Sequence, residues 1–295
     1  MAVTKRRYRL LADFHPVSRF LDEVYSLDGL NSYLLQPFFE YAHTHPMFQH
    51  QLTHRFGLWE EGDRLIAVAC YEMGLGEAFL SLRDGYNRLL PAMLDHAEQE
   101  LASVEDGQRT LGVWIMAAEE EKRSLLQQRG YQLVSSEPVT TFPYHRAFPS
   151  SPLPDGFQIL SLEDENDIAQ IHACLWKGFD HGPTPDNDLD CRLLMQSGPS
   201  FRSDLATVVK APNGDYACFA GMWLNEANHY AYLEPMATVP EYRRMGLATA
   251  ALVAAMEKTK QLGAEYCFGG SPRFYTAIGF DVIGQRELWR QRWPL

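Results

Sequence analysis

The hydrophobic pattern of the second half of the chain alternates between strand and helix periods. Residues 157–162 alternate apolar and polar side chains, and residues 163–176 carry apolar side chains at helical spacing. Two further strands are expected at 205–210 and 216–224. The turn Pro212-Asn213-Gly214-Asp215 joins them as a hairpin, because Asn-Gly tolerates positive φ angles. This order of elements predicts an α/β fold.

The pattern then leads from a strand into a long helix. Residues 230–239 predict a strand, and a helix runs to about Leu262, with Gly263 as its stop. Four shorter elements are expected downstream: a strand at 265–268, a helix at 274–278, and strands at 280–283 and 288–293.

The first half of the chain repeats this order in blurred form. Residues 57–71 predict two strands joined by a turn, and residues 88–101 predict a helix. The segment 125–131 parallels 274–280, and aligning Gly130 with Gly279 gives an offset of 149, about half of the 295 residues. The sequence therefore predicts an internal repeat.

A proline-rich segment separates the two halves. Four prolines lie between Pro143 and Pro154, and the segment has neither helical nor strand periodicity. A chain of 295 residues is long enough for two domains of roughly 150 residues each. We expect domains over 1–145 and 157–295, joined by a linker over 146–156.

Composition narrows the class of protein. Hydrophobic residues make up 46% and charged residues 22%, as in folded proteins. A net charge of −12 disfavours a nucleic-acid partner and makes a cationic partner easier to accommodate. Neither a signal-peptide core nor a stretch of roughly 20 apolar residues is present, which predicts a cytoplasmic protein without a membrane partner. The five cysteines are far apart and are expected to be reduced core residues.

The stretch most informative about chemistry leads from the strand at 230–239 into the following helix. It reads Arg243-Arg244-Met245-Gly246-Leu247-Ala248, with small residues that let the backbone approach a ligand closely. The free amides of a first helical turn favour a pyrophosphate, and two arginines add cationic donors.

Residues 157–295 resemble the GNAT superfamily of acyl-CoA-dependent N-acetyltransferases. The family pattern [QR]-x-x-G-x-[GA] after V-x-P-E-Y is met by Thr238 to Ala248, with Thr238 in place of the usual Val. A second family signature, F-Y-x-x-x-G-F, is present from Phe274 to Phe280. The resemblance implies two tandem α/β (α+β) domains, each a mixed, mostly antiparallel sheet flanked by helices.

The resemblance also implies roles for individual residues. Backbone groups of Met236 and Thr238 would bind the pantetheine arm of acetyl-CoA, and the amides of 244–249 would cradle its pyrophosphate. Tyr275 would protonate the departing thiolate, which suits a phenol that is neutral at pH 7. The residues expected to bind acetyl-CoA are Met236, Ala237, Thr238, Arg243, Arg244, Met245, Gly246, Leu247, Ala248, Thr249 and Phe274.

The general base is harder to assign. Glu234 precedes Pro235, which cannot donate a ladder hydrogen bond and therefore predicts a bulge or splay in the strand. Its carboxylate is a candidate base for an ammonium acceptor, and an ordinary strand carboxylate is the equal alternative.

The first half departs from the family pattern at two places. Tyr275 corresponds to Leu126, which has no proton to give, and the segment after the strand at 78–82 lacks R-x-x-G-x-[GA]. This half is expected to be a degenerate GNAT domain. It would cover the active domain, shape the acceptor site or form a homodimer.

Two further clusters contain residue types that are common in binding sites. His50 and His54 have a spacing that can bind metal on a helix, but no Cys or second pair supports them, so no metal is expected. Four aspartates lie between Asp180 and Asp190, in the connection that borders the acceptor groove in the GNAT layout. They form a solvated loop or attract a cationic acceptor.

The sequence as a whole predicts an acetyltransferase. The expected reaction moves an acetyl group from acetyl-CoA to an amine by direct attack in a ternary complex. The alternative is an acyl-CoA-binding regulator or scaffold without turnover, against which the retained Tyr275 argues. The acceptor stays open among a small amine, an antibiotic, an amino acid and a protein amino group.

Overall fold

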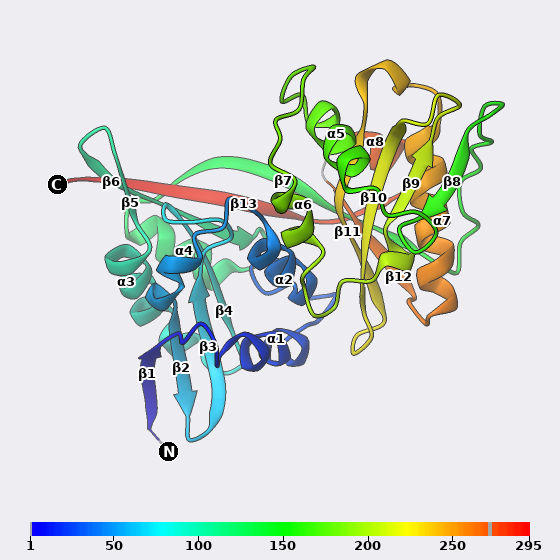
Figure 1. Ribbon diagram of the computed structural model, residues 1–295. Coiled ribbons are helices and arrows are strands. Elements are labelled where there is room, and N and C mark those ends of the chain that lie inside the picture. Colours follow the sequence, from blue (N-terminus) through cyan, green and yellow to red (C-terminus); the bar gives the residue numbers. More distant parts are fainter. Residues whose placement is uncertain (1, 271–272) are drawn as a thin grey trace. The chain divides into compact units, whose positions relative to one another are not determined.

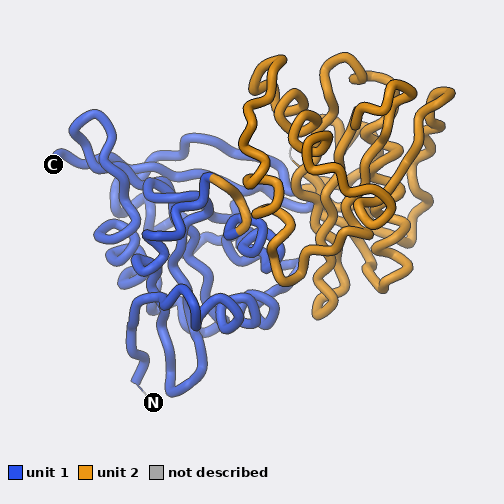
Figure 2. The backbone as a smooth tube through the Cα atoms, in the orientation of Figure 1, with its two compact units in different colours: residues 1–43, 47–139, 283–295 blue, residues 44–46, 140–282 orange. Residues whose placement is uncertain are grey.

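The computed structural model describes residues 2–270 and 273–295. The chain forms two compact units (Figure 2). Unit 1 comprises Met1–His43, Met47–Val139 and Ile283–Leu295, and unit 2 comprises Thr44–Pro46 and Thr140–Val282. In the described residues, no helix is long and apolar enough to cross a membrane.

Unit 1 is a sheet with helices. Its strands are β1 (Val3–Arg7), β2 (Gly57–Glu61), β3 (Arg64–Cys70), β4 (Glu77–Leu82), β5 (Ser103–Glu105), β6 (Gln108–Met116) and most of β13 (Asp281–Pro294). Its helices are α1 (Phe14–Glu23), α2 (Gln36–Thr44), α3 (Leu90–Glu100) and α4 (Glu120–Gln128), with short 3-10 turns η1 (His50–Arg55) and η2 (Asn87–Leu89). The strand order is β1-β2-β3-β4-β6-β13, in which β4 and β6 are parallel and the other neighbours antiparallel.

Unit 2 has the same plan. Its strands are the end of β7 (Gln132–Pro143), β8 (Gln158–Ser161), β9 (Thr207–Lys210), β10 (Tyr216–Asn225), β11 (Tyr230–Thr238) and β12 (Tyr266–Gly269). Its helices are α5 (Ile168–Gly178), α6 (Asp190–Met195), α7 (Leu247–Gln261) and α8 (Arg273–Ala277), with 3-10 turns η3 (Ser203–Leu205) and η4 (Pro240–Tyr242). The order is β8-β9-β10-β11-β12-β7, and again only one neighbouring pair in that order, β11 with β12, is parallel.

The two units therefore repeat one mixed, mostly antiparallel topology, as the sequence predicts. The last strand of each sheet comes from the other half of the chain. Residues 286–294 of β13, red in Figure 1, run antiparallel to residues 108–116 of β6. Residues 140–143 of β7 pair with residues 266–269 of β12. The two strands expected at 280–283 and 288–293 are thus one continuous strand.

The boundaries between the two compact units do not lie in the proline-rich segment 146–156, where a linker is expected. The divisions fall at Val139/Thr140 and Val282/Ile283, within β7 and β13. The proline-rich segment 146–156 packs on unit 2, where Phe148 and Leu153 contact the hydrophobic core. Proline fixes φ without adding periodicity, so a segment can lack helical and strand patterns and still be held by side-chain packing.

The core of unit 2 explains how α7 approaches the sheet. Ala251 and Ala255 are buried on α7 beside Leu252 and Met256, and the helix packs on β9 and β10. Small side chains at the contact allow a short distance between helix and sheet. The opposite helix, α5, packs on β10 and β11. The start of α7 is therefore fixed relative to the end of β11.

Candidate active site

The turn between β11 and α7 has a backbone that requires glycine at one position. Gly246 is the N-cap of α7 and has φ 80° and ψ 0°, in the left-handed region. A side chain there is strained, because Cβ crowds the backbone in this conformation. Arg244 also has a positive φ, 65°. Because α7 begins at Leu247, its first amides have no partners within the helix and can donate to an anion.

A cleft opens beside this turn. Its volume is about 590 Å³, and it is lined by Gly178, Met236, Ala237, Thr238, Tyr242, Arg243, Arg244, Gly246, Leu247, Ala248, Thr249, Phe274, Tyr275 and Ile278. Eleven of the thirteen residues expected from the sequence are in this lining. Met245 and Glu234 are outside it, and Met245 is 37% exposed. Gly178, Tyr242 and Ile278 line the cleft without having been expected there.

The cleft lies where β11 leaves its neighbour β12. Residues 230–232 of β11 pair with 266–268 of β12, and no pair beyond Tyr232 joins these strands in the described residues. On the other side, the register of β10 with β11 shifts between Ala220 and Met222. A Cβ at Gly221 would lie 2.7 Å from the carbonyl oxygen of Glu234. The bulge predicted beside Pro235 is therefore confirmed, and it turns the end of β11 towards the cleft.

The charge of the cleft is opposite to that of the protein. Arg243 and Arg244 are the charged residues in its lining, whereas the chain as a whole carries a net charge of −12. The side chain of Arg244 is exposed and has no hydrogen bond or ion pair to any described residue. The guanidinium of Arg243 is engaged by oxygens of unit 2, as described below. The lining therefore favours an anionic ligand.

Tyr275, on the short helix α8, also lines the cleft. Its side chain is 8% exposed, and its ring packs edge-on to Phe280 with the ring centroids 5.3 Å apart. Its hydroxyl donates to the thioether sulfur of Met236 at 3.7 Å. A phenol held in this way can donate a proton to a group in the cleft.

Glu234 precedes Met236, the partner of this hydroxyl, by two residues on β11. Its side chain is half-buried, and its backbone carbonyl accepts a hydrogen bond of 2.8 Å from the Trp223 indole. Glu234 lies in the bulge of β11 and is not among the residues that line the cleft. Its role as general base stays a prediction.

The segment that the sequence marks as a linker touches the turn directly. The Ser151 hydroxyl donates to the carbonyl of Gly246 at 2.9 Å. A Cβ at Gly246 would lie 2.3 Å from this hydroxyl oxygen. Ser151 therefore helps to hold the turn in its left-handed conformation.

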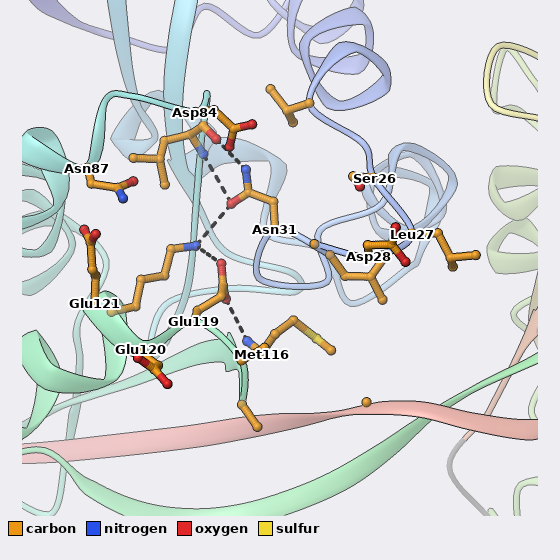
Figure 3. A pocket seen from close by; sticks show the side chains of 18 of the residues that line it. Ser26, Leu27, Asp28, Asn31, Asp84, Asn87, Met116, Glu119, Glu120 and Glu121 are labelled. Atoms are coloured by element: carbon orange, nitrogen blue, oxygen red, sulfur yellow. Dashed lines mark hydrogen bonds and ion pairs between the residues drawn. The ribbon is translucent and has the colours of Figure 1, made fainter.

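Unit 1 has a cavity at the corresponding place, which Figure 3 shows from close by. It has a volume of about 740 Å³ and lies between the ends of β4 and β6 and the starts of α3 and α4. Where α7 begins after Gly246, α3 begins after Leu89, whose φ is −83°, and Pro91 removes one donor from its first turn. The charged residues of this cavity are five carboxylates and one ammonium: Asp28, Asp84, Glu119, Glu120, Glu121 and Lys122. Such a lining disfavours phosphates.

A hydrogen-bond network around Lys122 fills the floor of that cavity. The ammonium is 5% exposed and donates to the Glu119 carboxylate at 2.6 Å, the Ser32 hydroxyl at 2.8 Å and the Asn31 side-chain oxygen at 3.1 Å. Figure 3 shows Asn31 and Glu119 converging on this nitrogen. Burial lowers the pKa of Lys122, and the Glu119 carboxylate opposes that shift. The network is structural, because each group in it already has a partner.

Two neighbouring histidines of the first half, His43 and His50, contact backbone carbonyl groups. The Nδ1 atom of His43 lies 2.8 Å from the Phe39 carbonyl oxygen, and Nε2 of His50 lies 2.8 Å from the His43 carbonyl oxygen. Burial lowers the pKa of His43 to about 4. Within residues 2–270 and 273–295, no group of three or more His, Cys, Asp or Glu side chains has an arrangement that could hold a metal ion. All five cysteines are free, and four of them are buried.

The comparisons with known proteins agree with this geometry. Residues 166–280 match the acetyltransferase (GNAT) family. Among curated proteins, none matches the chain. The residues that match the GNAT family include the turn at Gly246 and the helix of Tyr275.

Solved structures resemble the whole chain. A GCN5-related N-acetyltransferase from Sphaerobacter thermophilus is 16% identical, with a TM-score of 0.61 over 98% of this chain and 95% of that one. A tandem GNAT protein from the clavulanic acid biosynthesis pathway is 12% identical, with a TM-score of 0.58 over 99% and 98%. The N-myristoyltransferase of Saccharomyces cerevisiae is 13% identical, with a TM-score of 0.58 over 98% and 79%. At these identities the likenesses show the fold.

The fold resemblance extends over both units, whereas the sequence match is confined to the half that holds the arginine-lined cleft. Residues 166–280 therefore match the GNAT acetyltransferase family, and the chain as a whole has the fold of tandem GNAT proteins.

Proposed function

We propose that the chain transfers the acetyl group of acetyl-CoA to an amine acceptor by direct attack in a ternary complex. The observation that carries this proposal is the cleft of unit 2, whose lining combines two arginines and the start of α7 with Tyr275. The arginines and the first amides of α7 suit the anionic end of acetyl-CoA. Its thioester would then lie near Met236 and Tyr275.

The transfer uses Tyr275 in the cleft and either Glu234, which lies outside the lining, or water. The neutral amine attacks the thioester carbonyl, so that a C–N bond forms and the C–S bond breaks. The thiolate that leaves takes the phenolic proton of Tyr275, and solvent returns a proton to the tyrosinate. The amine loses its proton to water or to Glu234. Positioning both substrates in one cleft supplies most of the rate gain, because it converts a bimolecular reaction into a unimolecular one.

The acceptor we favour is a cationic or neutral amine. One of the four aspartates between Asp180 and Asp190 is engaged within unit 2, because Arg243 contacts the Asp180 carboxylate at 2.9 Å. Asp188 and Asp190 are exposed carboxylates that can attract an ammonium group. The attraction is therefore weaker than four free carboxylates would give.

The proposal is tested with acetyl-CoA and a panel of amines. We expect calorimetry to find one acetyl-CoA site per chain, and free thiol to be released when the right amine is present. A longer acyl-CoA in the same assay reports on acyl preference. Binding without thiol release from any acyl-CoA would favour the regulator over the enzyme.

A further inference from the structure

Arg243 contacts three oxygens of unit 2. Its Nε donates to the carbonyl of Thr238 at 3.1 Å, at the end of β11. Its Nη2 donates to the carbonyl of Gly178 at 2.9 Å, at the end of α5, and to the carboxylate of Asp180 at 2.9 Å. The guanidinium therefore joins the strand that forms one wall of the cleft to the helix that forms another.

The end of α5 is built for this contact. A Cβ at Gly178 would lie 2.7 Å from the Ala237 Cβ and 3.2 Å from the Thr238 amide nitrogen, so only glycine allows the helix to approach β11 so closely. The last carbonyls of a helix have no partners within it, and they carry the negative end of its dipole. A guanidinium at the Gly178 carbonyl satisfies both needs.

Asp180 has an unusual conformation for its residue type. Its φ is 58°, in the left-handed region, directly after the end of α5. Its amide donates to the Lys177 carbonyl at 3.0 Å, and the next amide, of His181, donates to the Trp176 carbonyl at 3.0 Å. This position usually holds Gly or Asn. The contact of its carboxylate with Arg243 explains why an aspartate occupies this position.

The loop that begins at Asp180 runs to the start of α6. We name residues 179–189 the aspartate loop. The loop also passes close to the buried His172, whose Nε2 lies 3.2 Å from the Asp186 carboxylate without forming a hydrogen bond. The loop begins beside Gly178, a residue of the cleft wall.

We propose that Arg243 is a positioning residue, which fixes the aspartate loop against the cleft wall rather than binding the phosphates of acetyl-CoA. Three of the five N–H donors of its guanidinium already serve Thr238, Gly178 and Asp180, which fixes the plane of the group. The phosphates are left to Arg244 and to the first amides of α7. This inference rests on the proposed function in one respect, that the cleft takes acetyl-CoA.

The first test measures hydrogen exchange of the aspartate loop in the free protein. Asp180→Asn keeps a residue that tolerates the left-handed conformation but removes the charge. We expect this variant and Arg243→Gln each to raise exchange at 180–189 several-fold, and the double variant to raise it no further, because both remove one interaction. Arg244→Gln, the matched control, should leave the loop protected.

The second test measures acetyl-CoA affinity of the same proteins by calorimetry. Arg244→Gln should weaken binding about tenfold, as expected for one charge-assisted hydrogen bond. Arg243→Gln should weaken it no more than Asp180→Asn does. Once an acceptor is known, Asp180→Asn should raise the KM for the acceptor and leave the KM for acetyl-CoA unchanged.

The outcomes separate the two proposals. If Arg243→Gln loses affinity as Arg244→Gln does, and Asp180→Asn changes neither exchange nor affinity, then Arg243 is a phosphate ligand and the inference is overturned. If the native protein binds no acetyl-CoA, the proposed function fails, while the exchange test still decides what Arg243 does. Arg243→Lys keeps the charge without the planar fork, and we expect it to restore protection only in part.

Discussion

Leu126 of unit 1 and Tyr275 of unit 2 occupy the same position in the same turn. The carbonyl of each accepts a hydrogen bond of 3.0 Å from the amide five residues on, of Tyr131 and Phe280 respectively. The residue before that amide is in each case a glycine with positive φ, 83° at Gly130 and 102° at Gly279. Both units thus retain the backbone of this turn, but only unit 2 has a phenol at this position, on Tyr275.

We expect Tyr275→Phe to lower turnover and to keep acetyl-CoA affinity nearly intact. The ring keeps its packing on Phe280, and only the proton donor is lost. General acid catalysis is worth about 10² to 10⁴ in rate, which corresponds to about 3–5 kcal/mol in the barrier. A thiol with a pKa near about 8.5 is a tolerable leaving group, so a loss near the lower end is expected.

The matched control places the phenol in the other unit. Leu126→Tyr in the Tyr275→Phe protein should restore nothing, because the cavity of unit 1 is lined by carboxylates and lacks the turn of Gly246. Steady-state rates with the physiological acceptor decide the matter. A native rate in Tyr275→Phe would reassign Tyr275 to packing and leave water as the proton donor.

Gly246→Val should weaken acetyl-CoA binding strongly. A non-glycine residue at φ 80° costs about 1–2 kcal/mol, and a branched side chain crowds the turn further. Because 1.4 kcal/mol is about a factor of ten in affinity, calorimetry should show a loss of at least about tenfold.

Ser151→Ala separates the two causes of that loss. It removes the hydroxyl that would clash with the new side chain, but it leaves the backbone strain. We expect it to rescue Gly246→Val only slightly. Normal binding by Gly246→Val, or two equivalent sites per native chain, would refute the assignment of the turn.

The sequence predicts the cleft well because its main residues are close together along the chain. Residues 243–249 form one turn, and its glycine and small side chains are a local signal. Gly178 is different, because its importance arises only when α5 meets β11, which no local pattern encodes. A glycine at the end of an amphipathic helix was the one available signal, and it indicates equally a helix stop.

The exchange of strands between the halves could not be predicted from periodicity. The hydrophobic pattern of a strand is the same whichever sheet the strand joins, and this holds for residues 140–143 and 286–294. The pattern of a strand sets which face is buried, but its partner is set by the completed sheet. The sequence therefore predicts a boundary at the proline-rich segment 146–156, whereas the compact units divide within β7 and β13.

Separate production of residues 157–295 should therefore give a chain that does not fold stably. It lacks residues 140–143, which pair with β12, and the buried side chains of Phe142 and Tyr144. An extension from residue 140 restores that strand and is the matched control. Circular dichroism and urea unfolding compare the two, and a cooperative transition in the shorter chain would contradict the prediction.

Asp13 should make unit 1 sensitive to acid. Burial of this carboxyl favours its neutral form, but hydrogen bonds from Arg9 and Arg6 outweigh burial and lower its pKa from 3.8 to about 2. The folded state thus binds fewer protons than the unfolded state between these values. The stabilisation, about 2 kcal/mol, is present above the unfolded pKa and is lost as pH falls through the folded pKa.

Asp13→Asn tests this by comparing urea unfolding near pH 6 with unfolding near pH 3. The variant should be less stable than the native protein near pH 6, and the difference should shrink as the pH falls. An equal difference at both pH values would mean that the Arg6 and Arg9 contacts act through packing alone.

Glu72 should have the opposite effect on unit 1. Burial, together with the nearby Glu77 carboxylate, raises its pKa from 4.5 to about 7, although Arg286 opposes the shift. The folded state therefore binds more protons than the unfolded state between these values, and stability should fall as pH rises through this window. The loss is at most about 3 kcal/mol, and partial exposure of the side chain reduces it.

Glu72→Gln cannot ionise, so it should match the native protein near pH 4 and be more stable near pH 8. Urea unfolding at the two pH values gives the comparison, and Glu77→Gln, which removes one neighbouring charge, should recover part of the difference. A Glu72→Gln protein that loses stability at both pH values would show that the carboxylate is held by contacts that compensate its burial.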